Sequence, residues 1–305
     1  MGRRLLGAAL ALLASASLVF LLAATAPGDA ALALAGEELA PGQAAELARL
    51  HGLDAPWLQR WGAWLWALAR GDLGHSLRSG APVAALIAER LPVTLALMLP
   101  ALLLSTALGL AAGLAGAGLG PRGAALFAAA MTGAHALPGF LVAQLLVLGF
   151  ALGLGWLPVQ GLGDGVLGWM RHLALPVLAL ALHQLCFLAL LARAGVASEM
   201  ARPYALAARA RGRGAASVRW RHALPNALAP IVTLLGLRMG ALFAGAVIIE
   251  TVFALPGLGR LAVGAALARD HPVLVGCVLV ATSGIILANL LADAVLARLD
   301  PRRRA

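Results

Sequence analysis

At Pro203 the chain reads Pro203-Tyr204-Ala205-Leu206-Ala207-Ala208-Arg209-Ala210-Arg211-Gly212, a short basic stretch that interrupts long apolar segments. Pro203 suits the first turn of a helix, and Gly212 and Gly214 supply a stop. The surrounding loop, Arg193 to His222, contains one acid, Glu199, against seven arginines, at positions 193, 202, 209, 211, 213, 219 and 221. This pattern predicts a short helix that lies outside the membrane and binds another protein.

The composition is that of a polytopic membrane protein. The 305 residues are 62% hydrophobic and 12% charged, whereas soluble domains average about 25% charged residues. The formal charge of +10 indicates arginines that anchor cytoplasmic loops to anionic lipid, and we do not expect a nucleic-acid partner.

All 23 basic residues are arginines, since the chain contains no lysine. A P-loop needs a lysine to reach the nucleotide phosphates, and Schiff-base chemistry also needs one. An ATP-driven role therefore requires a separate ATPase chain. Cys186 and Cys277 lie in apolar segments outside any Cys-x-x-Cys pair, so we interpret them as small core residues.

Six apolar segments are long enough to cross a bilayer, which takes about 20 residues. We therefore predict an all-α integral membrane fold. The first segment could instead be a cleavable signal peptide, but its apolar core exceeds the roughly 7–15 residues typical of one, so a retained span is favoured. The predicted spans are Leu5–Thr25, Val93–Leu119, Ala125–Leu154, Leu173–Ala192, Leu224–Ile249 and Pro272–Leu296.

Arginine placement predicts the orientation, because cytoplasmic loops carry the excess of basic residues. With the N-terminus inside, the inner segments hold Arg3, Arg4, Arg122, the seven loop arginines, Arg298 and Arg302 to Arg304. Both termini are then cytoplasmic, and the longest outer stretch is 26–91. In that stretch Trp57, Trp61 and Trp64 share one helical face, which favours an interfacial amphipathic helix over a docking surface for an outer partner.

A few polar residues lie inside the predicted spans. A central arginine such as Arg238 costs about 2.5–3.5 kcal/mol on insertion scales, so it should face protein or water. Two interpretations stay open: a translocation-path residue that attracts an anionic group, and a structural arginine paired to a carbonyl or shifted toward one interface. We interpret His135, His183 and Gln184 as satisfied core groups, because a metal path through His183 and Cys186 lacks a third ligand. We do not expect an intramembrane serine protease with Ser283 as its nucleophile, because the sequence supplies no base within hydrogen-bond reach of it.

Small residues at four-residue spacing predict close helix packing at three places. They are Gly109-Gly113, Gly236-Gly240 and Ala241-Gly245.

The stretch Tyr204–Gly212, followed by Arg221-His222-Ala223-Leu224-Pro225-Asn226-Ala227, resembles the cytoplasmic coupling ("EAA") loop of type I ABC-importer permeases in the peptide and nickel branch. Leu206 stands where the family's glutamate would align. Other matching motifs occur in family order along nearly the whole chain. They are Pro27-Gly28-Asp29, Gly71-Asp72-Leu73-Gly74, Glu89-Arg90-Leu91-Pro92, Glu250-Thr251-Val252-Phe253, Pro256-Gly257-Leu258-Gly259 and Leu299-Asp300-Pro301-Arg302.

The resemblance implies six transmembrane helices with a cytoplasmic coupling helix and an extracytoplasmic subdomain after the first helix. The implied regions are a first helix (1–25), an outer subdomain (26–91), a permease domain (92–297, with its coupling loop at 193–225) and a basic tail (298–305). It implies no catalysis, cofactor or metal. The implied contacts with ATPase subunits are Pro203, Tyr204, Ala207, Ala208, Arg209, Ala210, Arg211, Gly212, His222, Leu224 and Pro225.

The implied function is ATP-driven, binding-protein-dependent import across the bacterial inner membrane, most simply of di- or oligopeptides. The implied partners are a second permease subunit, two ATPase subunits and an extracytoplasmic solute-binding protein. Nickel or another small solute stays open as cargo on the same scaffold. A secondary transporter is the alternative from another class, although it would need ionisable coupling sites at the midplane.

Overall fold

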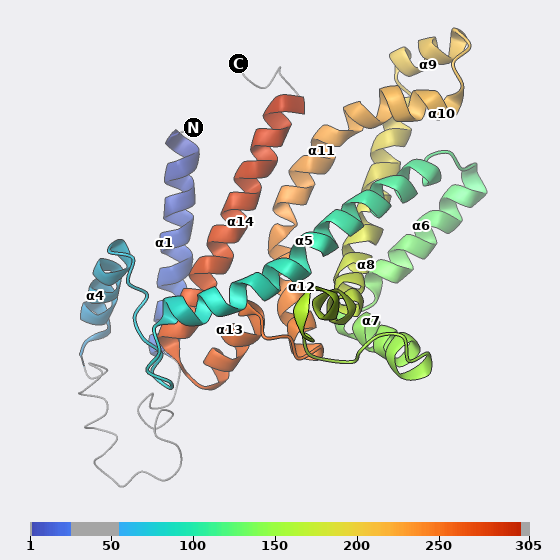
Figure 1. Cartoon of the computed structure of the whole chain (residues 1–305). Coiled ribbons are helices and arrows are strands. Elements are labelled where there is room, and N and C mark those ends of the chain that lie inside the picture. Colours follow the sequence, from blue (N-terminus) through green and yellow to red (C-terminus); the bar gives the residue numbers. More distant parts are fainter. Residues whose placement is uncertain (1, 26–54, 300–305) are drawn as a thin grey trace. The chain divides into compact units, whose positions relative to one another are not determined.

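The computed structural model describes residues 2–25 and 55–299. The chain divides into two compact units: unit 1 combines residues up to Thr94 with Pro256–Ile286, and unit 2 combines Leu95–Leu255 with the residues from Leu287 onward. Within the described residues all regular structure is helical except one isolated bridge between His75 and Pro82 (Figure 1). The predicted all-helical class is confirmed.

Three described helices are long and apolar enough to cross a membrane: α5 (Val83–Gly116), α8 (Gly165–Met200) and α14 (His271–Leu299). Two bent helix pairs raise the number to five if each pair is one span. In α1 (Gly2–Thr25) the apolar described part, Leu6–Leu22, is shorter than these. The described residues thus contain three to five candidate spans, where the apolar runs alone predict six.

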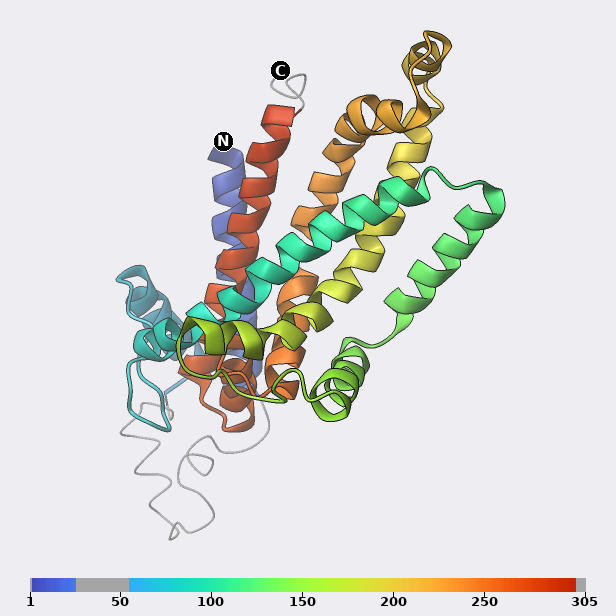
Figure 2. The same ribbon diagram turned by 45° about the vertical axis from the view of Figure 1, so that its right-hand side comes forward.

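The predicted span over 125–154 is not one continuous helix. The chain forms α6 (Pro121–Ala136), α7 (Gly139–Leu146) and η1 (Val147–Gly153), with a bend of 92° after α6. Pro138 causes the break, because a proline disfavours helical backbone at the preceding residue, and Leu137 is extended (φ −67°, ψ 130°). Figure 2 shows the chain turning sharply between α6 and α7.

The predicted span over 224–249 is also bent. Its two parts are α11 (Leu224–Leu237) and α12 (Met239–Val252), and they meet at Arg238 with a bend of 49°. Two other predicted boundaries are too narrow, since α5 begins at Val83 rather than Val93 and α8 begins at Gly165 rather than Leu173.

Unit 1 contains α1, α4 (Trp57–Ala69), α13 (Leu258–Leu267) and the adjoining parts of α5 and α14. The Trp61 indole N–H donates to Ser17 Oγ at 3.1 Å, and the Trp64 ring stacks on Phe20 at 5.6 Å. Two tryptophans of the predicted aromatic face therefore pack on α1, while Trp57 is half exposed. The main core cluster consists of Val83, Ile87, Leu258, Ala265, Val273 and Cys277.

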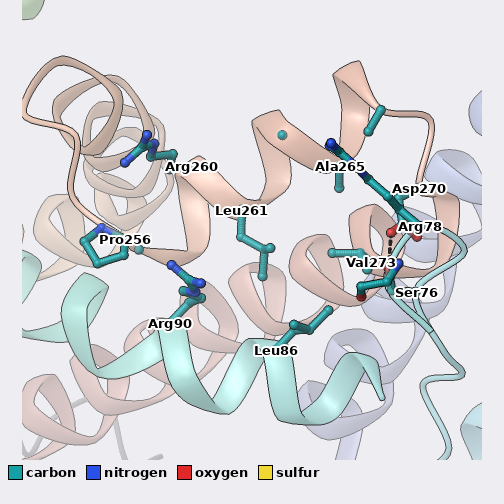
Figure 3. A pocket seen from close by; sticks show the side chains of 14 residues that line it. Ser76, Arg78, Leu86, Arg90, Pro256, Arg260, Leu261, Ala265, Asp270 and Val273 are labelled. Carbon is teal, nitrogen blue, oxygen red and sulfur yellow. Dashed lines mark hydrogen bonds between the residues drawn. The ribbon is translucent and has the colours of Figure 1, made fainter. Parts of the chain in front are cut away.

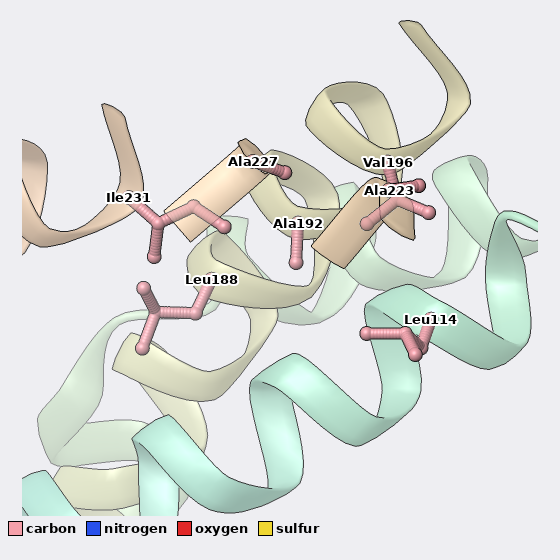
Figure 4. Close-up of a cluster of buried hydrophobic side chains, with 7 residues drawn as sticks. All are labelled: Leu114, Leu188, Ala192, Val196, Ala223, Ala227 and Ile231. Carbon is pink, nitrogen blue, oxygen red and sulfur yellow. The ribbon is translucent and has the colours of Figure 1, made fainter. Parts of the chain in front are cut away.

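Unit 2 is built around α8, which packs against α5, α6 and α11. A Cβ added at Gly109 would lie 2.7 Å from Leu188 Cβ, and one added at Gly113 would lie 2.5 Å from Ala192 Cβ. The backbones of α5 and α8 are therefore in close contact at these glycines, and the close packing that the Gly109-Gly113 spacing predicts is confirmed. Figure 4 shows the cluster that this contact buries: Leu114, Leu188, Ala192, Val196, Ala223, Ala227 and Ile231. This core supports the basic loop at one end of the unit.

Candidate functional site

The basic loop connects α8 to α11 through three short helices. They are α9 (Pro203–Ala210), α10 (Ala215–Val218) and η2 (Arg219–Ala223). Figures 1 and 2 both show α9 and α10 at the tip of unit 2, beyond the end of α8. The predicted short helix is present with the predicted start.

Local sequence explains both ends of α9. Pro203 occupies the first helical turn after Arg202, whose backbone is extended. At the other end Gly212 has φ +82°, and the Gly212 and Arg213 N–H groups donate to Arg209 O (2.9 Å) and Ala208 O (3.2 Å). These two bonds form a Schellman motif, for which glycine is the favoured residue. The predicted stop at Gly212 is therefore confirmed.

The two faces of α9 differ. Ala205 and Ala208 are buried against Val218 and Met200, which holds α9 to its own loop. Ala208, predicted as a partner contact, therefore points inward. The other predicted residues of the stretch are exposed: Pro203, Tyr204, Ala207, Arg209, Ala210, Arg211 and Gly212.

Two apolar side chains add to the exposed surface of the loop, although sequence reasoning did not select them. Leu206 is 50% exposed and Trp220 is 59% exposed. For Trp220 the signal was present in the sequence, because this apolar residue lies between Arg219 and Arg221 outside a predicted span. Large apolar side chains surrounded by basic groups are typical of a protein contact.

A small polar network fixes the start of α9. The Tyr204 hydroxyl donates to Glu199 Oε2 at 2.7 Å and accepts from Asn226 Nδ2 at 3.3 Å. Asn226 Nδ2 also donates to the His222 carbonyl at 2.7 Å. The network joins the end of α8, α9 and the start of α11. Partial desolvation, followed by the hydrogen bond to the Glu199 carboxylate, raises the pKa of Tyr204.

The three predicted ATPase contacts that follow α9 in the chain lie where the loop joins α11 rather than on α9. Leu224 packs against the unit 2 core cluster, His222 is half-buried and Pro225 is exposed in the first turn of α11. Within the described part of the chain, His222 Nδ1 is buried without a hydrogen-bond partner. Nearby, the Arg219 guanidinium lies against Gly118, which follows α5.

Arg238 lies apart from this loop, at the break between α11 and α12. Its guanidinium carbon is 3.7 Å from the centre of the Phe187 ring, which is a cation–π contact. Its backbone N–H donates to the Leu234 and Leu235 carbonyls at 3.0 and 3.2 Å. The half-buried side chain thus lies against an aromatic ring of α8.

His135 lies next to that ring, with ring centres 6.1 Å apart. His135 stacks on His183 with ring centres 4.1 Å apart, and His135 Nδ1 lies 3.0 Å from the His183 carbonyl. His183 and Gln184 also line a cavity of about 280 Å³ between α7, α8 and α12, whose lining does not include Arg238. Cys186 is buried. Among the described residues, no group of three or more His, Cys, Asp and Glu could hold a metal ion.

The helical fold and the candidate spans define a multi-pass membrane protein with an exposed basic loop. The chain belongs to the family described as "Binding-protein-dependent transport system inner membrane component", whose model matches residues 105–305. The N-terminal model, described as "Binding-prot-dependent transport system membrane comp, N-term", matches residues 1–98.

Curated relatives are similar over nearly their full length. A Brucella abortus (strain 2308) protein, named provisionally as a peptide transport system permease protein, is 39% identical over 95% of this chain and 93% of its own. The "Probable peptide ABC transporter permease protein y4tP" of Sinorhizobium fredii is 35% identical over 94% and 93%. The "Glutathione transport system permease protein GsiC" of Escherichia coli (strain K12) is 35% identical over 99% and 97%.

Family membership makes the chain the membrane permease component of a binding-protein-dependent ABC importer. It is a multi-pass inner-membrane protein and a non-catalytic subunit, and transport by this family involves ATPase and binding-protein partners in general. The secondary-transporter and membrane-enzyme alternatives are set aside.

Proposed function

We propose that this chain imports di- or oligopeptides. The identity to permeases named for peptide and glutathione transport, over nearly the whole length of each chain, carries this proposal. Glutathione is itself a short peptide, so both named cargoes share a peptide backbone and a carboxylate. This chemistry favours peptides over nickel, which stays the alternative cargo.

We propose six spans with both termini in the cytoplasm: α1, α5, the α6–η1 segment, α8, the α11–α12 segment and α14. Counting each bent pair as one span leaves α1 as the sixth. Ala16 of α1 is fully buried beside Val275 and Leu279 of α14, which supports retention of α1. The proposed regions remain 1–25, 26–91, 92–297 and 298–305, and residues 26–54 lie outside the described part of the chain.

In the proposed complex, this chain pairs with a second, unlike permease subunit above two ATPase subunits, and a solute-binding protein delivers cargo outside. The exposed surface of α9, together with Leu206 and Trp220, enters a groove of an ATPase. The buried Ala205 and Ala208 and the Tyr204 network transmit the movement to α8 and α11. ATP binding would then move these helices and alternate access.

Gly212→Val tests this coupling. Valine at φ +82° is strained, by about 1–3 kcal/mol, although an added Cβ meets nothing within 4 Å. The strain changes the direction of α9 and leaves the proposed spans unchanged. We expect normal insertion, with loss of ATPase co-purification or of cargo-stimulated ATP hydrolysis in proteoliposomes.

Gly214→Val is the matched control. Gly214 also has open space around its Cβ position, but its φ is −61°, which valine adopts without strain. It should behave like the parent. Parental ATPase binding and parental hydrolysis in a well-inserted Gly212→Val protein would refute the coupling role.

We also propose that Arg238 lines the translocation path and favours cargo with an anionic group. Arg238→Gln should assemble normally and lower uptake of peptides that carry a free carboxylate. Phe187→Leu is the control for the cation–π contact, because it removes the ring and keeps the charge. If Arg238→Gln transports every cargo like the parent, or if Phe187→Leu reproduces its whole effect, Arg238 is structural.

A further inference from the structure

A second basic site lies in unit 1, and none of its residues belongs to the basic loop. It is a cavity of about 410 Å³ between the turn 76–79, the start of α5, and α13 with the start of α14. Figure 3 shows Arg90 and Arg260 at one end, near Pro256, with Arg78 and Asp270 at the other. Leu86, Leu261 and Val273 line the space between them.

The lining is strongly basic, with three guanidinium groups against one carboxylate. That carboxylate, Asp270, is only 5% exposed. It accepts hydrogen bonds from the Ser76 hydroxyl and from the Leu77 N–H (3.1 Å). Asp270 therefore holds the turn of the cavity wall in place, and the net charge facing the cavity is positive.

Arg90 presents an unused donor. Its Nε is buried and has no hydrogen-bond partner among the described residues. Its Nη2 lies 3.3 Å from Glu89, whose side chain is mostly exposed. Buried N–H groups are nearly always satisfied, so this one points to a ligand. The guanidinium fork matches the geometry of a phosphate or carboxylate.

The apolar lining strengthens such an interaction. Leu86, Leu261 and Val273 keep part of the wall dry, and charge-assisted hydrogen bonds are stronger in low dielectric. Neither the coupling role of α9 nor the cargo proposal uses this cavity.

We propose that this cavity binds a phosphate group, carried by an anionic phospholipid headgroup or free as inorganic phosphate. Arg90 binds it from the buried side and Arg260 binds it at the same end of the cavity, while Arg78 at the other end adds to the positive charge that attracts it. In the proposed topology the cavity lies on the outer side of the membrane, where both sources are present.

Two measurements on the full-length chain in neutral detergent separate the sources. Calorimetric titration with inorganic phosphate tests the free anion. Native mass spectrometry after addition of phosphatidylglycerol or phosphatidylcholine tests the lipid headgroup. We expect retained adducts of phosphatidylglycerol in excess of phosphatidylcholine, or saturable phosphate binding, or both.

Arg78→Gln and Arg260→Gln are the main variants, because both side chains are exposed and their removal should not disturb packing. Arg78→Gln should weaken binding only a few-fold, because it removes a charge at the far end of the cavity. Arg260→Gln should weaken binding about tenfold, the loss expected for one charge-assisted hydrogen bond. Arg90→Gln should weaken it at least as much. Arg171→Gln is the control, since Arg171 lies in α8 and is absent from the cavity lining.

Binding that falls in the cavity variants and persists in Arg171→Gln supports the site, and the responding probe identifies the source. The proposal is overturned if the parent binds neither probe. It is also overturned if Arg260→Gln binds like the parent, or if Arg171→Gln loses as much binding as Arg260→Gln. None of these outcomes depends on transport, so failure of the proposed cargo or coupling leaves this test unaffected.

Discussion

Tyr204 illustrates how one side chain orients a whole helix. It is the single tyrosine of the chain, and its hydroxyl joins Glu199 of α8 to Asn226 of α11. The hydroxyl donates to a carboxylate, and such charge-assisted bonds are about twice as strong as neutral ones. The network therefore fixes the direction in which α9 leaves α8.

Because the chain has one tyrosine, its ionisation can be followed by near-ultraviolet absorbance of the purified protein. Partial desolvation and the Glu199 hydrogen bond raise the pKa of Tyr204, so the titration midpoint should lie above the ordinary value of about 10. Glu199→Gln removes the charge and should move the midpoint down toward that value. A midpoint at or below that of free tyrosine in the parent would contradict the network.

The raised pKa also sets the pH range of the network. The protonated phenol is the form that the folded loop stabilises, so its contribution is fully present below the ordinary pKa. The contribution is lost only as the pH rises through the raised value. Coupling should therefore not depend on Tyr204 ionisation at neutral pH.

The close contact between α5 and α8 depends on glycines that have no side chain. At Gly113 an added Cβ would lie 2.5 Å from Ala192 Cβ and 2.8 Å from the Ala189 carbonyl, so the backbones of α5 and α8 would have to separate. At Gly133 in α6 an added Cβ meets nothing within 4 Å. The two positions are a matched pair.

We expect Gly113→Ala to destabilise the chain by about 1–3 kcal/mol, because the added methyl group would overpack the contact between α5 and α8. Gly133→Ala should be neutral or stabilise by about 0.5–1 kcal/mol, because alanine is the better helix former. Apparent unfolding midpoints in the same detergent compare the two. Equal midpoints for both variants would mean that α5 and α8 are not in close contact.

The proposed orientation of the entire chain rests on the placement of its arginines, and it can be tested with single cysteines. The native Cys186 and Cys277 are 4% and 2% exposed, so the parent should give little background with a membrane-impermeant thiol reagent. Gln160→Cys and Ala216→Cys place a thiol at exposed positions, before α8 and in α10 respectively.

In intact cells the reagent should label Gln160→Cys and leave Ala216→Cys unlabelled until the membrane is permeabilised. The reverse pattern would place the basic loop outside and remove its role as a coupling element. Labelling of both variants in intact cells would indicate damaged membranes, which a cytoplasmic control protein reports.

Local sequence was sufficient for features that depend on neighbouring residues or on composition. The helical class followed from long apolar runs, α9 from Pro203 and Gly212, and close helix packing at Gly109 and Gly113 from their spacing, although the spacing did not identify α8 as the neighbour. The coupling-loop motifs predicted the family. Apolar length alone did not predict the bends at Pro138 and Arg238, because a hydrophobic run has the same composition whether it is straight or broken.

Contacts between distant residues were decided only by the tertiary structure. Ser76 and Asp270 are 194 positions apart and share a hydrogen bond, and the cavity arginines come from three separate segments. Likewise, nothing in the alanine-rich stretch distinguishes the buried Ala208 from the exposed Ala207, because the buried face of α9 depends on where Val218 and Met200 lie. The apolar pattern of this sequence determined a membrane protein and its coupling-loop motifs a permease, while which side chains meet depended on how the helices pack.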